Sequence, residues 1–168
     1  MMTVALKGSI TVSWSSSDLT SLNFVEDKHK DKALNDRYIS AGHSLDMMSI
    51  GLLQEHRILP EWALNIRDGF SLRKTAATIH KIKPGHYLPL HHDLYTTYKK
   101  INNIIDEDIY RLIVFLEDWK PGHMLDIDGI IYNQWRAGDY VGWTNATLHA
   151  AYNLGTEDRY TLQITGIA

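Results

Sequence analysis

The chain has 168 residues, of which 44% are hydrophobic and 22% charged, and its formal net charge is -3. This length and balance are typical of one ordinary globular domain and exclude a fibrous repeat or a disordered chain. The absence of cysteine excludes disulfides, thiolate metal sites and a cysteine nucleophile, so any metal ion must be bound by His, Asp or Glu.

The amino-terminal segment, "MMTVALKGSITVSW", lacks the basic stretch and long apolar run of a leader peptide. No later window reaches the ~18 apolar residues that a membrane span needs. We therefore expect a cytoplasmic protein with no membrane partner. The net acidity also argues against a nucleic-acid partner, because binding to phosphates draws on clustered Lys and Arg.

Residues 17–70 show polar and apolar positions that recur at helical spacing. The clearest predicted helix has as its apolar positions Leu45, Met48, Leu52 and Leu53. Ser44 or Asp46 is available as its cap, although Gly51 weakens it. Pro60 predicts the first position of another short helix, where its fixed φ fits and its missing N–H is not needed.

From Leu72 onward the pattern changes to short β-type runs separated by turn residues such as Asp128-Gly129. The runs are "TAATIHKI", "YLPLHHD", "IYRLIVFL", "HMLDI", "IIYNQW", "DYVGW", "LHAAYN" and "RYTLQITGI". Eight such runs are typical of a jelly roll, a cupin-like double-stranded β-helix. Because "IYRLIVFL" is apolar on both faces, its sheet must be covered by the facing sheet on one side and by the amino-terminal helices on the other.

The segment "LPLHHDLY", residues 88–95, sets two imidazoles beside a carboxylate. Side chains at i and i+2 of a strand share a face, so His91 and Asp93 face together and His92 points away. Two ligands are too few for a stable catalytic metal site. The best third ligand is His149 in "TNATLHAAYN", on a later strand that a jelly roll can bring beside the first.

Two imidazoles and one carboxylate form the ligand set of non-haem Fe(II) oxygenases, which leaves coordination positions open. A zinc site with a bound water is the competing interpretation of the same ligands. Arg159 lies ten residues after His149 and shares a strand face with Thr161 and Gln163. An unpaired guanidinium inside an apolar barrel costs several kcal/mol, so Arg159 needs an anion. A carboxylate fits its planar fork, and the hydroxyl of Thr161 can add a hydrogen bond.

These residues resemble the Fe(II)- and 2-oxoglutarate-dependent dioxygenase superfamily over roughly residues 72–168. The matching elements are "LPLHHD" for the His-x-Asp motif, His149 for the distal histidine, and Arg159 in Arg-x-Thr for the co-substrate. The segment "HAAYNLGTEDRYTLQI" also looks like the distal part of aspartyl/asparaginyl hydroxylases and some prolyl hydroxylases. The chain departs from the first group by having Asp93, and from the second by having "DWKPGHML" in place of a glycine-pair turn.

The resemblance implies that His91, Asp93 and His149 bind Fe(II), that 2-oxoglutarate chelates the iron, and that Arg159 and Thr161 hold its far carboxylate. Dioxygen would then give succinate, carbon dioxide and an oxidised substrate, with ascorbate a further candidate cofactor. The expected substrate is a peptide, an amino acid or another small molecule. A cupin-like protein that binds a metal or small ligand without oxidation stays open, as does a nucleic-acid demethylase of the same superfamily.

We accordingly expect a mainly β single domain, residues 1–168. Residues 1–71 would form an amino-terminal strand and buttressing helices, and residues 72–168 the jelly-roll catalytic core. The segment 94–108 is either an active-site loop or an exposed, partly helical excursion. Trp143 is the best tryptophan for a substrate platform. Surface positions, or positions around the ligands, are expected for His43, His56, His80, His86 and His123.

Overall fold

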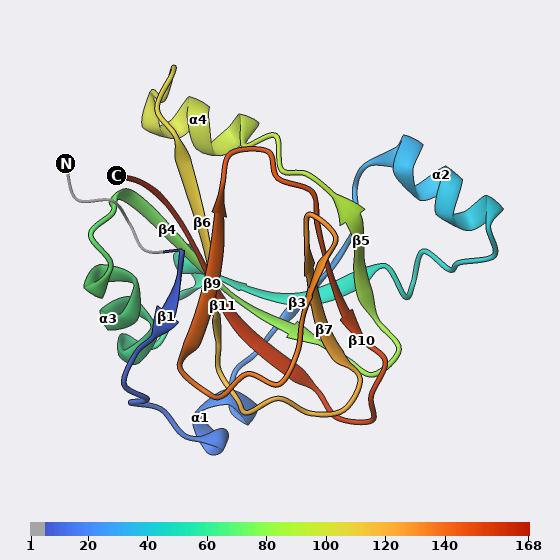
Figure 1. Ribbon diagram of the computed structural model, residues 1–168, viewed down its shortest axis with the longest axis horizontal. Coiled ribbons are helices and arrows are strands. Elements are labelled where there is room, and N and C mark those ends of the chain that lie inside the picture. Colours follow the sequence, from blue (N-terminus) through green and yellow to red (C-terminus); the bar gives the residue numbers. More distant parts are fainter. Residues whose placement is uncertain (1–5) are drawn as a thin grey trace.

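Two antiparallel sheets form the computed structural model of the chain, which describes residues 6–168 (Figure 1). The larger sheet has the order β1 (Lys7–Ser9), β9 (Asp139–Thr144), β6 (Ile109–Phe115), β11 (Arg159–Ile167), β4 (Arg73–Ile82), β3 (Ser49–Gln54) and β2 (Val25–Lys28). The smaller sheet has the order β5 (Tyr87–His91), β10 (His149–Asn153), β7 (His123–Ile127) and β8 (Ile130–Tyr132). The first five residues of the amino-terminal segment, where no leader is expected, lie outside the described residues.

The eight predicted strand runs are confirmed, since each overlaps one of the strands β4 to β11 over at least half of its length. The fold is therefore mainly β, and the two packed sheets form a jelly roll. Side chains from both sheets build the core between them, with Ile113 and Phe115 of the larger sheet packed in one cluster with Leu125, Ile127 and Ala151 of the smaller sheet. Among the described residues, no helix combines the length and apolar character that a membrane crossing requires.

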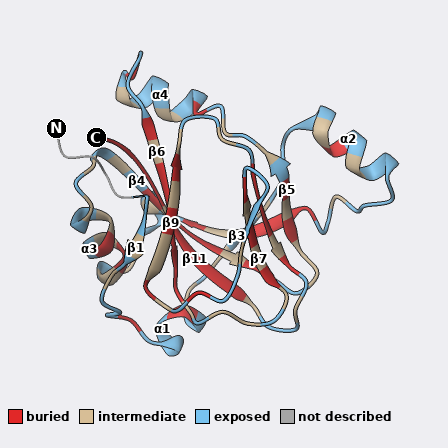
Figure 2. Cartoon of the chain, viewed as in Figure 1, coloured by how far each residue is buried: buried red, intermediate tan, exposed pale blue. Residues whose placement is uncertain are grey.

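Strand β6 is buried on both faces, as its apolar sequence predicts. Leu112 and Val114 pack in a second core cluster with residues of the amino-terminal elements α1 (Ser16–Thr20) and α3 (Glu61–Gly69). Ile113 points the other way, into the core between the sheets. Figure 2 shows the buried residues concentrated along β6 and β11 in the middle of the molecule. As predicted, β6 is covered by the smaller sheet on one face and by amino-terminal helices on the other.

The helix predicted around Leu45 to Leu53 is wrong, because this segment ends in strand β3. β3 pairs with β2 on one side and with β4 on the other. Ile50 enters the core between the sheets, whereas Leu53 enters the core under the helices, so the strand is buried on both faces. Two ladders of hydrogen bonds and burial on both faces outweigh helical spacing in a segment that Gly51 already weakens as a helix.

The observed helices of the amino-terminal region lie elsewhere. α2 (Lys32–Ser40) begins after Asp31, whose carboxylate accepts a hydrogen bond from the backbone N–H of Leu34. A short 3-10 helix, η1 (Glu55–Arg57), follows β3, and α3 begins directly after Pro60, one residue later than predicted. Because β1, β2 and β3 belong to the larger sheet, the amino-terminal region supplies strands as well as helices. The division into residues 1–71 and 72–168 stays a prediction.

Candidate metal centre

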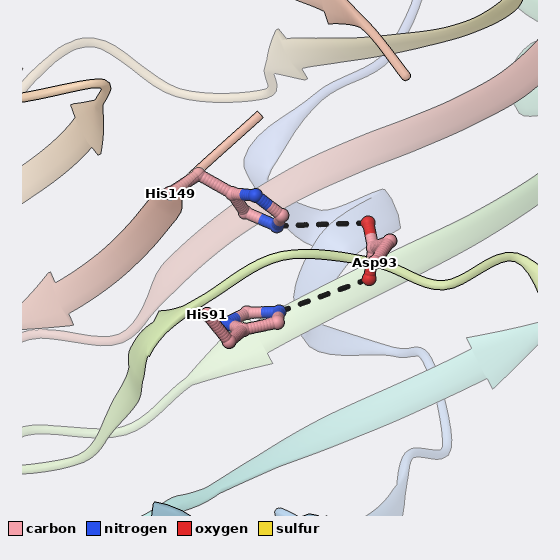
Figure 3. Close-up of side chains that lie close together, drawn as sticks. All are labelled: His91, Asp93 and His149. Carbon is pink, nitrogen blue, oxygen red and sulfur yellow. Dashed lines mark ion pairs between the residues drawn. The ribbon is translucent and has the colours of Figure 1, made fainter. Parts of the chain in front are cut away.

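Three ligand side chains converge where strands β5 and β10 run side by side (Figure 3). His91 is the last residue of β5, Asp93 follows two positions later, and His149 is the first residue of β10. His149 is the antiparallel partner of His91, so the register of the smaller sheet brings the two imidazoles together. One ligand atom from each of the three residues lies within 4.8 Å of the others. His92 is exposed and points away, as strand alternation predicts.

Backbone carbonyls fix the orientation of both imidazoles. Nδ1 of His91 lies 2.6 Å from the carbonyl oxygen of Pro89, and Nδ1 of His149 lies 2.9 Å from that of Thr147. A carbonyl oxygen only accepts, so both Nδ1 atoms carry the proton and both Nε2 atoms keep a free lone pair. The Nε2 atoms of His91 and His149 lie 3.8 Å and 3.6 Å from the carboxylate of Asp93. These distances are longer than a hydrogen bond and are suitable for donor atoms that bind the same metal ion.

The charges of the three ligands also suit a divalent ion. Burial lowers the pKa of His149 to about 4, and it lowers the pKa of His91 as well. Burial by itself would raise the pKa of Asp93, but the positive charge of Arg111, followed by the two imidazoles, brings it below its ordinary value. At neutral pH the group therefore presents two neutral imidazoles and one carboxylate, the protonation states that bind metals. A His-Asp-His group of this kind could bind a metal ion.

Arg159 lines the same cavity as the three ligands, a space of about 260 Å³ between the sheets. Its side-chain face is shared with Thr161 and Gln163, whereas Leu162 and Ile164 are fully buried in the opposite core, as predicted. Arg159 is only 2% exposed, and among the described residues its Nε and Nη2 have no hydrogen-bond partner.

The guanidinium of Arg159 stays charged despite its burial. Burial lowers the pKa of Arg159 to about 10, so the group is still protonated at neutral pH. Its Cζ lies 5.4 Å from the ring of Trp135, a contact that supports a cation but does not neutralise it. Asp27 and Asp93 also line the cavity, but no carboxylate of the described residues forms an ion pair with Arg159. A buried charge in this situation is costly unless a ligand supplies an anion.

Three further residues line the cavity, and of these only Arg111 was not predicted from the sequence. Nη2 of Arg111, on β6, lies 2.8 Å from Oδ2 of Asp93. The sequence indicates the importance of Arg111 only in that this charged residue interrupts the apolar run "IYRLIVFL". His80 of β4 is 7% exposed and lines the cavity, so of its two expected positions it takes the one around the ligands and not the one on the surface. Trp143 of β9 lines the cavity with its ring centroid 4.5 Å from that of His149.

The segment 94–108 contains a helix, α4 (Thr96–Asn102), at the end of the sandwich near β6 (Figure 1). The helix agrees with the exposed, partly helical alternative, and an active-site role of the segment stays a prediction. Tyr95 is buried, with its ring 5.0 Å from the guanidinium carbon of Arg111, whereas Lys99 and Lys100 are exposed. The segment thus packs Tyr95 against Arg111 and buries Ile104 in a small cluster with Tyr95, while the lysines of α4 face solvent.

A larger cavity, of about 360 Å³, lies near β2 and β3. Its lining includes Phe24, Lys81 and His86 but none of the three ligand residues. The largest of these cavities and the group of possible metal donors therefore lie in different places.

No family model and no curated protein sequence matches the chain. Among solved structures, the chain is similar to a protein of Acidithiobacillus ferrooxidans that is named provisionally as a sugar phosphate isomerase. The two sequences are 14% identical, the match covers 92% of this chain and 74% of that chain, and the TM-score is 0.50. A sugar phosphate isomerase from a cupin superfamily of Silicibacter pomeroyi has 14% identity over 90% of this chain and 74% of that one, with a TM-score of 0.48. A predicted oxalate decarboxylase of Thermotoga maritima has 16% identity over 71% and 82%, with a TM-score of 0.44.

At such identities the likeness concerns the fold alone. The first of these structures shares its fold with nearly the whole chain. None of the three is described as a 2-oxoglutarate oxygenase. The chemistry of this chain therefore has to be argued from its own residues.

Proposed function

We propose that the chain is an Fe(II)- and 2-oxoglutarate-dependent dioxygenase that hydroxylates a peptide or amino-acid side chain. In this reaction 2-oxoglutarate, dioxygen and a substrate C–H bond give succinate, carbon dioxide and a C–OH group. The observation that carries the proposal is the buried, unpaired guanidinium of Arg159 in the cavity that also contains His91, Asp93 and His149.

The donor set fits a ferrous ion. The two neutral imidazoles and the carboxylate of Asp93 would hold the iron and leave it free to bind a co-substrate and dioxygen, and the iron would supply the oxidation chemistry. Zn²⁺ could use the same ligands to activate a water for hydrolysis. A hydrolytic zinc site does not by itself call for a second, unpaired cation such as Arg159, which is why we favour iron.

The residues of the chain would bind and orient the co-substrate. Arg159 would form a two-pronged pair with the far carboxylate of 2-oxoglutarate, and the hydroxyl of Thr161, on the same strand face, would donate to the same group. Leu88, Ile113 and Leu125 give the cavity an apolar wall that limits water around the reacting groups. The carbonyl oxygens of Pro89 and Thr147, bonded to the Nδ1 atoms, would keep both Nε2 atoms available to bind the ion.

A second candidate is a cupin-like protein that binds a metal or small ligand without oxidation. The likeness in fold to a protein named as a sugar phosphate isomerase favours it, since another dianion, such as a phosphate ester, would also pair with Arg159. A nucleic-acid demethylase fits less well, because the net charge of -3 does not favour a polyanion.

Anaerobic addition of Fe(II) and 2-oxoglutarate separates the first two candidates. We expect a visible metal-to-ligand charge-transfer band that needs both additions, followed by succinate when oxygen is admitted. Glutarate, which lacks the keto group that chelates iron, is the matched control and should give no band. Fe(II) binding without a band and without succinate would overturn the dioxygenase and favour the binding protein.

A further inference from the structure

Arg111 is a buried cation in the middle of the larger sheet, where an arginine has no role in packing alone. It lies on β6 opposite Trp143 of β9, and its side chain is 9% exposed. A buried guanidinium needs an anion, and the carboxylate of Asp93 supplies one, with Nη2 2.8 Å from Oδ2. The pair is close in distance, although it is not aligned as a hydrogen bond.

The contact distinguishes the two oxygens of Asp93. Oδ2 lies 2.8 Å from Nη2 of Arg111 and 3.6 Å from Nε2 of His149, whereas Oδ1 lies 3.8 Å from Nε2 of His91 and has no ion pair with an arginine. An oxygen whose electrons are drawn toward a guanidinium is the poorer donor to a metal. The arrangement therefore leaves Oδ1 as the better ligand and disfavours binding through both oxygens.

Tyr95 in turn holds Arg111. Its ring lies 5.0 Å from the guanidinium carbon, and Nε of Arg111 donates to its hydroxyl at the long distance of 3.5 Å. Tyr95 has a left-handed backbone, with φ of 54°, which costs a side-chain-bearing residue roughly 1–2 kcal/mol. The chain adopts this conformation two residues after Asp93 and so turns the tyrosine inward against Arg111.

The number of open coordination positions makes this contact matter. An octahedral ion with two imidazoles and one carboxylate oxygen keeps three positions free, which is what a chelating 2-oxo acid and dioxygen need together. A carboxylate bound through both oxygens would leave only two. The contact of Arg111 with Asp93 therefore affects the number of open coordination positions, which decides whether the ion can bind a 2-oxo acid and dioxygen together.

We propose that Arg111, held by Tyr95, is a positioning residue that restricts Asp93 to binding a metal ion through one oxygen and so keeps a coordination position open. This inference rests on the metal site of the proposed function. The ion pair, the burial of Arg111 and the inward turn of Tyr95 all belong to the chain without any metal.

Water-proton relaxation of the Mn(II)-loaded protein counts the exchangeable waters on the ion and needs no turnover. Arg111→Gln is expected to lose about one metal-bound water and to bind Mn(II) at least as tightly as the unchanged protein, because a repelling charge is removed. Arg111→Lys keeps the charge and should keep most of the water count. Arg159→Gln removes the other guanidinium of the cavity and is the matched control, with an unchanged count.

A purely structural arginine gives a different result. Arg111→Gln would then misplace Asp93 and weaken Mn(II) binding with no loss of water, and that result would overturn the inference. If Arg111→Gln does not fold, Tyr95→Leu removes the ring that holds the arginine, and it should lower the water count in part. An unchanged count in folded Tyr95→Leu would equally overturn it.

The outcome is separable from that of the proposed function. A protein whose Mn(II) water count depends on Arg111, but which yields no succinate, would keep this inference and lose the dioxygenase. A full yield of succinate, together with a count of metal-bound waters that is the same with and without Arg111, would keep the dioxygenase and overturn this inference.

Discussion

His91 and His149 face each other across the pairing of β5 with β10, and their ring centroids lie 4.4 Å apart. Neither ring is free to turn, because each Nδ1 is bonded to a backbone carbonyl two residues earlier in the chain. The lone pairs that face the carboxylate of Asp93 are therefore set by strand register and backbone together. A ligand site made in this way exists before any ion binds.

Removing one imidazole should abolish most metal binding. We expect His91→Ala to weaken the binding of Mn(II) or Co(II) by on the order of 100-fold or more, since even residues behind the ligands contribute 10–100-fold. Its neighbour provides the control, because exposed His92 points away and His92→Ala should leave the affinity within about twofold. Calorimetric titration measures both. Equal losses in the two variants would mean that the strand register is not the one described.

Replacing Arg159 should separate co-substrate binding from stability. Arg159→Met keeps much of the volume but removes a guanidinium that has no partner on Nε or Nη2. We expect a loss of 2-oxoglutarate affinity of about 10- to 100-fold, equivalent to one or two charge-assisted hydrogen bonds, with Mn(II) affinity unchanged. Without ligand, the free energy of unfolding should hold or rise by about 1–4 kcal/mol, as when buried charges give way to apolar groups. A large destabilisation would instead make Arg159 a structural residue.

The buried His80 should make stability depend on pH. Burial, followed by the charges of Arg111 and Arg159, lowers the pKa of His80 from 6.5 to about 3. Below pH 6.5 this histidine is protonated in the unfolded chain but stays neutral in the folded chain. The free energy of unfolding therefore decreases as the pH falls from 6.5 toward 3, by up to about 1.4 kcal/mol per pH unit.

Urea unfolding at several pH values between 7 and 4 tests this dependence. His80→Gln should show a shallower fall in the free energy of unfolding than the unchanged protein. The exposed His56 supplies the comparison, and His56→Gln should reproduce the original slope. Parallel curves for all three proteins would remove His80 as the cause.

Two glycines with similar backbones should differ in their tolerance of a methyl group. Gly122 and Gly129 have φ of +90° and +80°, so alanine is strained at both. A Cβ on Gly122 would lie 2.3 Å from the backbone nitrogen of Gly155, whereas a Cβ on Gly129 meets nothing within 4 Å. Gly122→Ala should therefore cost about 1–3 kcal/mol more than Gly129→Ala, as seen for other overpacked sites. Thermal unfolding compares the two, and equal costs would show that the turn at Gly122 relaxes.

Local patterns were sufficient for the strands of the jelly roll and for the side-chain faces that carry the chemistry. The alternation of "RYTLQITG" puts Arg159 and Thr161 on the cavity side and Leu162 in the core, as the structure has it. The His-x-Asp spacing likewise puts His91 and Asp93 together and His92 outside. These predictions hold because side-chain direction along a strand depends only on neighbouring residues.

Contacts between distant segments decided the rest. The segment before Leu53 became strand β3 because β2 and β4 offer it hydrogen bonds on both edges, which no local spacing reveals. Arg111 and Asp93 are 18 positions apart, and only the packing of β6 behind the end of β5 makes them a pair. The sequence by itself determined which residue types could bind an ion and an acid, since those are chemical properties of single side chains. The tertiary structure alone decided which charges are paired and which stay unpaired, because the cost of a buried charge depends on every group that folding brings beside it.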